Sequence, residues 1–66
     1  METKHKLFIL NNMITLMEFN RSSLLGFYNE AKEHNQTDLI LLYSGMISIN
    51  LEMLKMINNA KELELK

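Results

Sequence analysis

The chain has 66 residues, a net charge of −1, no cysteine and no proline. This length allows one domain at most, and the lack of cysteine excludes a disulfide framework or a thiolate metal site. The seven basic residues form no stripe, which disfavours nucleic acid or an anionic membrane as partner. His5 and His34 are too far apart in the sequence to suggest a metal site, so we expect no metal and no cofactor.

The first predicted helix spans about residues 5 to 33. Apolar residues recur in it at steps of three and four, the period of one helix face. The short apolar run near its start ends at Asn11 and is too short for a signal peptide, and no stretch approaches a membrane span of roughly 18 apolar residues. We therefore expect a cytoplasmic protein. The predicted inner face of this helix consists of Leu10, Met13, Met17, Leu24, Tyr28 and Ala31.

A polar turn at about residues 34 to 37 separates this helix from a second one at about residues 37 to 62. We expect Asn35 with Asp38, or Thr37 itself, to cap the second helix. Its apolar residues follow a strict heptad pattern, which predicts the seam of an all-α, antiparallel two-helix hairpin formed by residues 1–66. This predicted seam consists of Leu42, Met46, Ile49, Met53, Met56, Ala60 and Leu63.

The chain has more apolar residues than one hairpin can bury. Leu16, Phe19 and Phe27 in the first helix, and Leu51 and Leu54 in the second, add to the two predicted faces. Two helices cover only part of each other's circumference, so a second apolar surface would remain in contact with water. We expect the hairpin either to dimerise into a four-helix bundle or to bind a dedicated partner, and both can hold.

Polar residues interrupt both helices at matching distances from the turn. This polar waist comprises residues 18 to 23 of the first helix and residues 48 to 52 of the second. Gly26 and Gly45 also lie at one level, and we expect them to mark close approach of the helices, with a bend or access for another molecule as alternatives. The waist is interpreted either as a contact surface or as a device that fixes the register of the helices, as a buried Asn50 would do.

Parts of the sequence are similar to the small stage-zero sporulation regulatory aspartyl-phosphate phosphatases of bacilli, which are two-helix hairpins of similar length. Their first helix carries a pattern like I-x-x-x-R, and "MEFNR" from Met17 to Arg21 resembles it. Their second helix carries a signature read as S-Q-E-L-D. Two degenerate registers compete for it here, "SGMIS" starting at Ser44 and "SINLE" starting at Ser48. The second is preferred because it keeps an acid, Glu52, at the last position.

The resemblance implies that the partner is a phosphorylated response-regulator receiver domain of a phosphorelay. Glu52 would orient the water that hydrolyses the aspartyl phosphate, with Asn50 and Ser48 as supports, and any Mg²⁺ would belong to the receiver. The alternatives are a non-catalytic interaction or inhibitor module, and a structural dimer. The residues predicted to contact the partner are Arg21, Ser44, Met46 and Met53.

Overall fold

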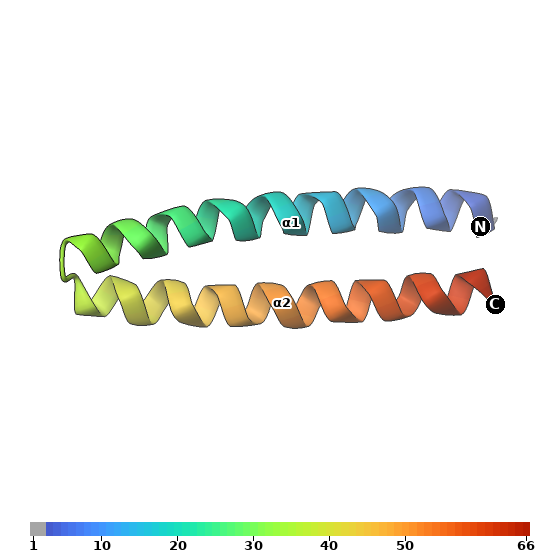
Figure 1. Cartoon of the computed structure of the whole chain (residues 1–66). Helices are drawn as coiled ribbons and strands as arrows, with labels where there is room; N and C mark the ends of the chain where they lie inside the picture. Colours follow the sequence, from blue (N-terminus) through green and yellow to red (C-terminus); the bar gives the residue numbers. More distant parts are fainter. Residues whose placement is uncertain (1–2) are drawn as a thin grey trace.

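The protein is an antiparallel helical hairpin. A computed structural model of the chain describes residues 3–66 and contains two helices, α1 (Thr3–Glu33) and α2 (Thr37–Leu65), packed side by side along their length (Figure 1). With no proline in the chain, nothing interrupts either helix. The predicted all-α hairpin is confirmed, with α2 running three residues beyond its predicted end.

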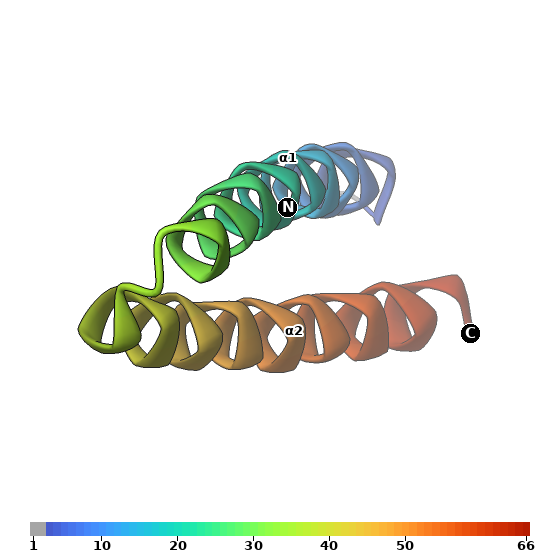
Figure 2. The same ribbon diagram turned by 60° about the vertical axis from the view of Figure 1, so that its left-hand side comes forward.

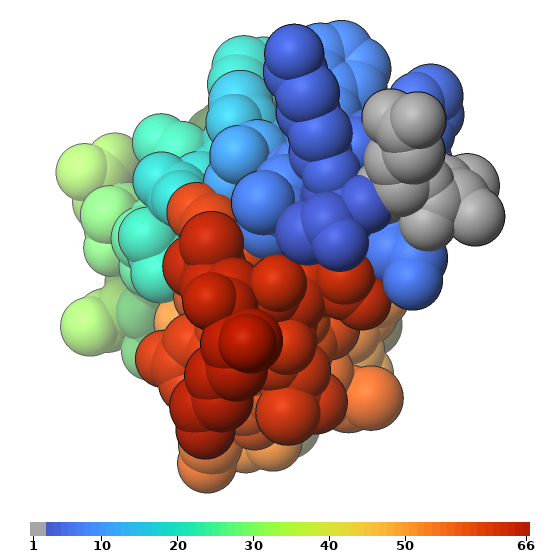
Figure 3. Space-filling view, turned by 90° about the vertical axis from the view of Figure 1, so that its right-hand side faces the viewer, coloured from blue at the N-terminus to red at the C-terminus, as the bar shows by residue number. Residues whose placement is uncertain are grey.

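The hairpin is long and thin, with extents of 49 × 15 × 14 Å. The turn lies at one end, and Figure 2 shows the short connection between the end of α1 and the start of α2. At the other end the beginning of α1 lies against the end of α2, as the space-filling view along the hairpin shows (Figure 3). The molecule is therefore one layer of two helices, and each helix has only one neighbour.

The turn is a Schellman motif with asparagine at its left-handed position. Asn35 has a φ of 54°, a conformation that asparagine tolerates better than most residues. Its N–H donates to the carbonyl of Lys32 (3.2 Å), and the N–H of Gln36 donates to the carbonyl of Ala31 (3.0 Å). These two bonds satisfy carbonyls at the end of α1 that the helix leaves free.

The predicted side-chain cap of α2 was wrong. The N-cap residue is Gln36, and its side chain makes no capping hydrogen bond. Asn35 instead turns the chain at the end of α1 with its left-handed backbone. It precedes the N-cap residue of α2 by one position and therefore does not cap that helix. Asp38 lies in the first turn of α2, where its charge suits the positive end of the helix dipole.

The two helices meet along two heptad stripes, which we call the inner stripes. Every residue in them is buried or half-buried, whereas nearly all other described residues are exposed. The inner stripe of α1 is Leu7, Leu10, Ile14, Met17, Arg21, Leu24, Tyr28 and Ala31. The inner stripe of α2 is Ile40, Tyr43, Ile47, Asn50, Leu54, Ile57, Lys61 and Glu64.

The predicted seam of α2 lies outside the hairpin, and that prediction was wrong by one residue at every position. Leu42, Ile49, Met56 and Leu63, which follow one another at seven-residue intervals, are 55, 62, 69 and 70% exposed. Helix α2 carries two heptad stripes one residue apart, and periodicity alone cannot decide between them. The prediction chose the stripe without polar residues, whereas in the structure the other stripe faces α1.

The prediction for α1 was closer. Five of its six residues belong to the inner stripe, and the sixth, Met13, is 40% exposed. The core between the helices is nevertheless small. Among residues 3–66 only Leu24, Ala31 and Ile57 are buried apolar residues, and Asn50 is the one buried polar residue.

Candidate functional site

A continuous apolar face runs along one side of the hairpin. Its residues come one position before those of the inner stripes, from Ile9 to Phe27 in α1 and from Leu42 to Leu63 in α2, which places them about 100° around each helix. Because the helices are antiparallel, this step leads to the same side of the hairpin from both. The apolar face is formed by Ile9, Met13, Leu16, Asn20, Ser23 and Phe27 of α1, and by Leu42, Met46, Ile49, Met53, Met56, Ala60 and Leu63 of α2.

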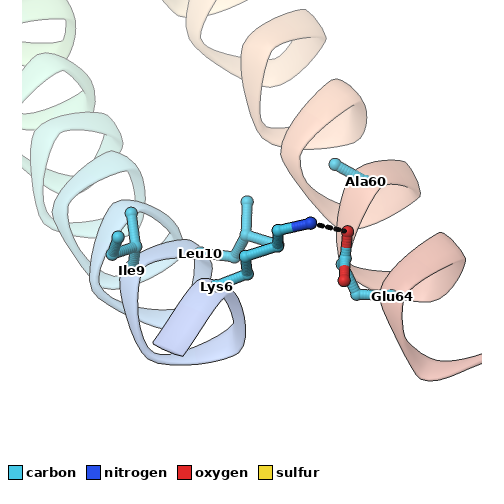
Figure 4. A pocket seen from close by; sticks show the side chains of 5 residues that line it. All are labelled: Lys6, Ile9, Leu10, Ala60 and Glu64. Carbon is cyan, nitrogen blue, oxygen red and sulfur yellow. Dashed lines mark hydrogen bonds and ion pairs between the residues drawn. The ribbon is translucent and has the colours of Figure 1, made fainter. Parts of the chain in front are cut away.

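Contacts between the helices confirm that the two halves of the apolar face lie beside each other. Near the chain termini, Ile9 and Ala60 line one shallow groove, with Leu10 at its base (Figure 4). At the turn end, the rings of Phe27 and Tyr43 stack across the helices with centroids 5.7 Å apart. The face is thus a single surface that extends along most of the hairpin.

Half-way along, a second groove joins the two helices. Its volume is about 290 Å³, and it takes Asn20 from α1 and three apolar-face residues from α2. It is lined by Met17, Asn20, Leu24, Met46, Ile49, Asn50 and Met53.

The composition of the apolar face differs from that of the remaining surface. It holds ten of the sixteen exposed large hydrophobic side chains among the described residues and contains no charged residue within these limits, while Lys6 and Glu30 continue the same positions beyond its two ends on α1. Four of the six methionines lie in it, and methionine side chains adapt their shape to a neighbouring surface. The opposite side of the hairpin carries charges such as Glu18, Lys32, Lys55 and Glu62.

Asn50 sits at the base of the middle groove and is 4% exposed. Its Nδ2 donates to the backbone carbonyl of Met17 at 3.0 Å and lies 3.8 Å from the Met17 sulfur. Its Oδ1 is buried without a hydrogen-bond partner. Asn50 therefore fixes the register of α2 against α1, in agreement with the register interpretation of the polar waist, and it does so with half of its amide unpaired.

The rim of the terminal groove carries an ion pair. Lys6 Nζ lies 3.5 Å from Glu64 Oε1, and this is the one salt bridge among residues 3–66 (Figure 4). The two side chains are 44% and 28% exposed, so water screens the pair and its contribution to stability is small. Glu18 and Glu52 of the polar waist form no ion pair with any other residue among residues 3–66.

The three residues assigned to catalysis point in different directions. Ser48 and Glu52 are exposed and lie one turn apart on the outer side of α2, whereas Asn50, between them in sequence, faces α1. Residues two apart in a helix differ by about 200° in direction. The fold thus brings Ser48 and Glu52 together and holds Asn50 away from them.

The four residues predicted to contact a partner are also divided. Met46 and Met53 are part of the apolar face, and both line its middle groove. Arg21 belongs to the inner stripe of α1 and is half-buried, whereas Ser44 is exposed on the other side of α2. Sequence reasoning missed the α1 half of the apolar face as a unit, although a second heptad stripe from Ile9 to Phe27 was readable.

The glycines do not mark close approach of the helices, and that prediction was wrong. A Cβ atom added to Gly26 or to Gly45 would meet no heavy atom within 4 Å. Both glycines lie on outward surfaces because neither position belongs to an inner stripe. Both residues also have ordinary helical backbone angles, so no left-handed conformation requires glycine at either place.

Two further properties bear on function. Among residues 3–66, no three side chains of His, Cys, Asp or Glu lie close enough together to hold a metal ion. By length and composition alone, helix α2 is apolar enough to cross a membrane, with a mean hydropathy of 1.4 over an 18-residue window of which 11% is buried; the core helices of soluble proteins pass the same test but are mostly buried. No protein-family model, no curated protein and no solved structure matches this chain.

Proposed function

We propose that this protein is a protein–protein interaction module that acts through its apolar face. The observation that carries the proposal is the concentration of exposed hydrophobic side chains on one side of the hairpin, in a stretch that holds no charged residue between Ile9 and Phe27 or between Leu42 and Leu63. Apolar patches larger than a few hundred Å² are rare on monomeric proteins and mark surfaces that other molecules cover. A non-catalytic module is thus the function that the geometry supports best.

The shape of the face favours a macromolecular partner over a small ligand. Small molecules bind in concave pockets that bury most of their surface. The grooves on this face are open and shallow, and the apolar residues continue between them along both helices. A helical partner laid along the hairpin would cover the face, because apolar residues at heptad spacing match those of another helix.

Single cysteine variants test this proposal directly, since the natural chain has no cysteine. Ile49→Cys places a thiol on the apolar face, and Leu51→Cys places one on the opposite side of the same helix. We expect thiol modification of the Ile49→Cys variant to be several times slower than that of the Leu51→Cys variant, in the purified protein or in lysate of the source organism. Equal rates in both settings would show that nothing covers the face.

A second candidate function keeps the resemblance to aspartyl-phosphate phosphatases. Ser48 and Glu52 are exposed together on the outer side of α2, where a receiver domain could reach both. Glu52 would orient a water toward phosphorus, Ser48 would support it, and Asn50 would hold the register of the hairpin. Arg21, half-buried between the helices, would support the fold near this site.

The phosphatase candidate is tested by the lifetime of a phosphorylated receiver from the same organism. We expect wild-type protein to shorten this lifetime and Glu52→Gln to lose the effect while keeping its helix content, because the amide keeps the shape but not the charge. A wild-type protein that binds the receiver without changing the lifetime would leave only the interaction module.

A further inference from the structure

We infer that the partner on the apolar face is a second copy of this chain, and that the working protein is a dimeric four-helix bundle. This inference rests on the proposed function and names the partner for the same face. It is carried by the area of the face, the arrangement of its two stripes, its lack of charge and the small size of the core.

The accessible surface of the hairpin is larger than its mass requires. The chain of 7.8 kDa exposes 5217 Å², whereas a compact monomer of this mass is expected to expose about 4,400 Å². The excess of roughly 800 Å² per chain equals the area that each partner buries in a protein–protein interface of standard size. One copy laid on another would remove this excess from both.

The arrangement of the face is that of half a four-helix bundle. Both helices present heptad stripes on the same side, and two such hairpins stacked face to face give each helix two apolar neighbours. A second copy also has the same 49 Å length, so it covers the face from the turn to the termini. A shorter or globular partner would leave part of the face exposed.

The lack of charge on the face suits a symmetric contact. A two-fold interface uses the same patch on both copies and brings like residues close together. Charged residues would then repel one another near the axis, and the apolar face has none. A different protein partner is commonly selected by complementary charges, and this face offers no charge that could serve that purpose.

The core of the single hairpin supports the same conclusion. Three buried apolar residues, Leu24, Ala31 and Ile57, form the buried hydrophobic part of the described chain. Proteins of this size that lack disulfides and metal ions need exceptional packing or oligomerisation to remain folded. The apolar face offers ten more large hydrophobic side chains for burial, provided that another chain covers them.

Two matched substitutions test the dimer. Met53 and Leu51 are both 44% exposed and lie in the same helix, but Met53 belongs to the apolar face and Leu51 to the opposite side. In sedimentation equilibrium at high micromolar concentration, we expect wild type and Leu51→Glu to have twice the mass of the chain. Met53→Glu should lose the doubled mass, because symmetry places two carboxylates in the apolar interface.

A second measurement decides the case in which Met53→Glu fails to fold. The melting temperature of a wild-type dimer rises with protein concentration, and that of a monomer does not. A wild-type protein with the mass of one chain and a melting temperature independent of concentration would overturn the inference. Equal loss of dimer in Leu51→Glu and Met53→Glu would overturn the assignment to this face.

The two proposals fail separately. If the wild-type protein is monomeric and thiol modification of its Ile49→Cys variant is slow in lysate, another protein covers the face. This result would support the interaction module and refute the dimer. A monomeric protein that cosediments with neutral phosphatidylcholine vesicles uses the apolar face on a membrane, which overturns both. A monomer whose Ile49→Cys variant reacts freely, and which binds no vesicles, also overturns both.

Discussion

Alanine in place of each helical glycine should stabilise this protein. Gly26 and Gly45 lie within long helices, where glycine costs more backbone entropy on folding than any other residue. The space next to both is open, since an added Cβ would have no heavy atom within 4 Å. The methyl group of alanine therefore meets no steric obstacle, and only the gain in helix propensity remains.

The magnitude follows from helix propensity alone. Glycine in a helix interior is about 1 kcal/mol less favourable than alanine, so Gly26→Ala and Gly45→Ala should each raise the free energy of unfolding by up to about 1 kcal/mol. The glycines lie on different helices and share no partner, so the double variant should gain up to about 2 kcal/mol. For a chain of this size, each 1 kcal/mol corresponds to a shift in melting temperature of roughly 4–8 °C.

Thermal melting followed by circular dichroism at one fixed protein concentration measures the effect. Ser44→Ala is a suitable control, because Ser44 is exposed beside Gly45 and serine costs a helix only about half as much as glycine. A lower melting temperature in both glycine variants would refute the reasoning. It would mean that the glycines contact something in the working protein, such as the backbone of another molecule.

Three further substitutions test individual features of the hairpin. Asn50→Leu should raise the free energy of unfolding by up to about 2 kcal/mol, because removal of a buried oxygen without a partner outweighs loss of the hydrogen bond to Met17, whereas the same change at exposed Asn59 should shift it by at most about 0.5 kcal/mol in urea unfolding. Asn35→Ala should lower the free energy of unfolding by about 1 kcal/mol in thermal melting and Asn35→Gly should not, because alanine lacks the short polar side chain that lets asparagine adopt a left-handed backbone, and glycine has no Cβ. Glu64→Gln should change the free energy of unfolding by less than about 1 kcal/mol, because its ion pair with Lys6 is solvated; a larger loss in urea unfolding would contradict that assignment.

Much of the fold was predictable from the sequence because it depends on local chemistry. A chain without proline, with apolar residues at helical spacing on both sides of the polar residues 33–38, has few alternatives to a helical hairpin. The inner stripe of α1 was also readable, since Leu10, Met17, Leu24 and Ala31 repeat at seven-residue intervals. Counting outward from the turn placed Asn50 opposite Asn20 and Arg21, and in the structure its amide bonds to the carbonyl of Met17, one turn nearer the start of α1.

The rotation of α2 about its own axis was not predictable from the pattern. Two stripes one residue apart differ by about 100° of rotation, and the apolar pattern favoured the outer one. The apolar pattern alone carries no information on the backbone geometry of the turn, where Asn35 has a left-handed φ and the chain bonds back to the end of α1. The error at Gly45 follows from the same cause, whereas Gly26 and Met13 lie on α1 and simply fall outside the inner stripe of that helix.

The choice of inner stripe supports the proposal that a second surface covers the apolar face. The stripe that α2 turns toward α1 contains Asn50, Lys61 and Glu64, whereas the stripe left outside contains no polar residue between Leu42 and Leu63. A hairpin that functioned alone would be less stable with this arrangement, because apolar side chains stabilise the folded state only when they are removed from water. The arrangement becomes favourable once a second surface covers the outer stripe. In the proposed dimer, Glu64 pairs with Lys6 at the solvated end of the inner stripes and Asn50 donates to the carbonyl of Met17, while the stripe without polar residues would lie at the centre of the four helices.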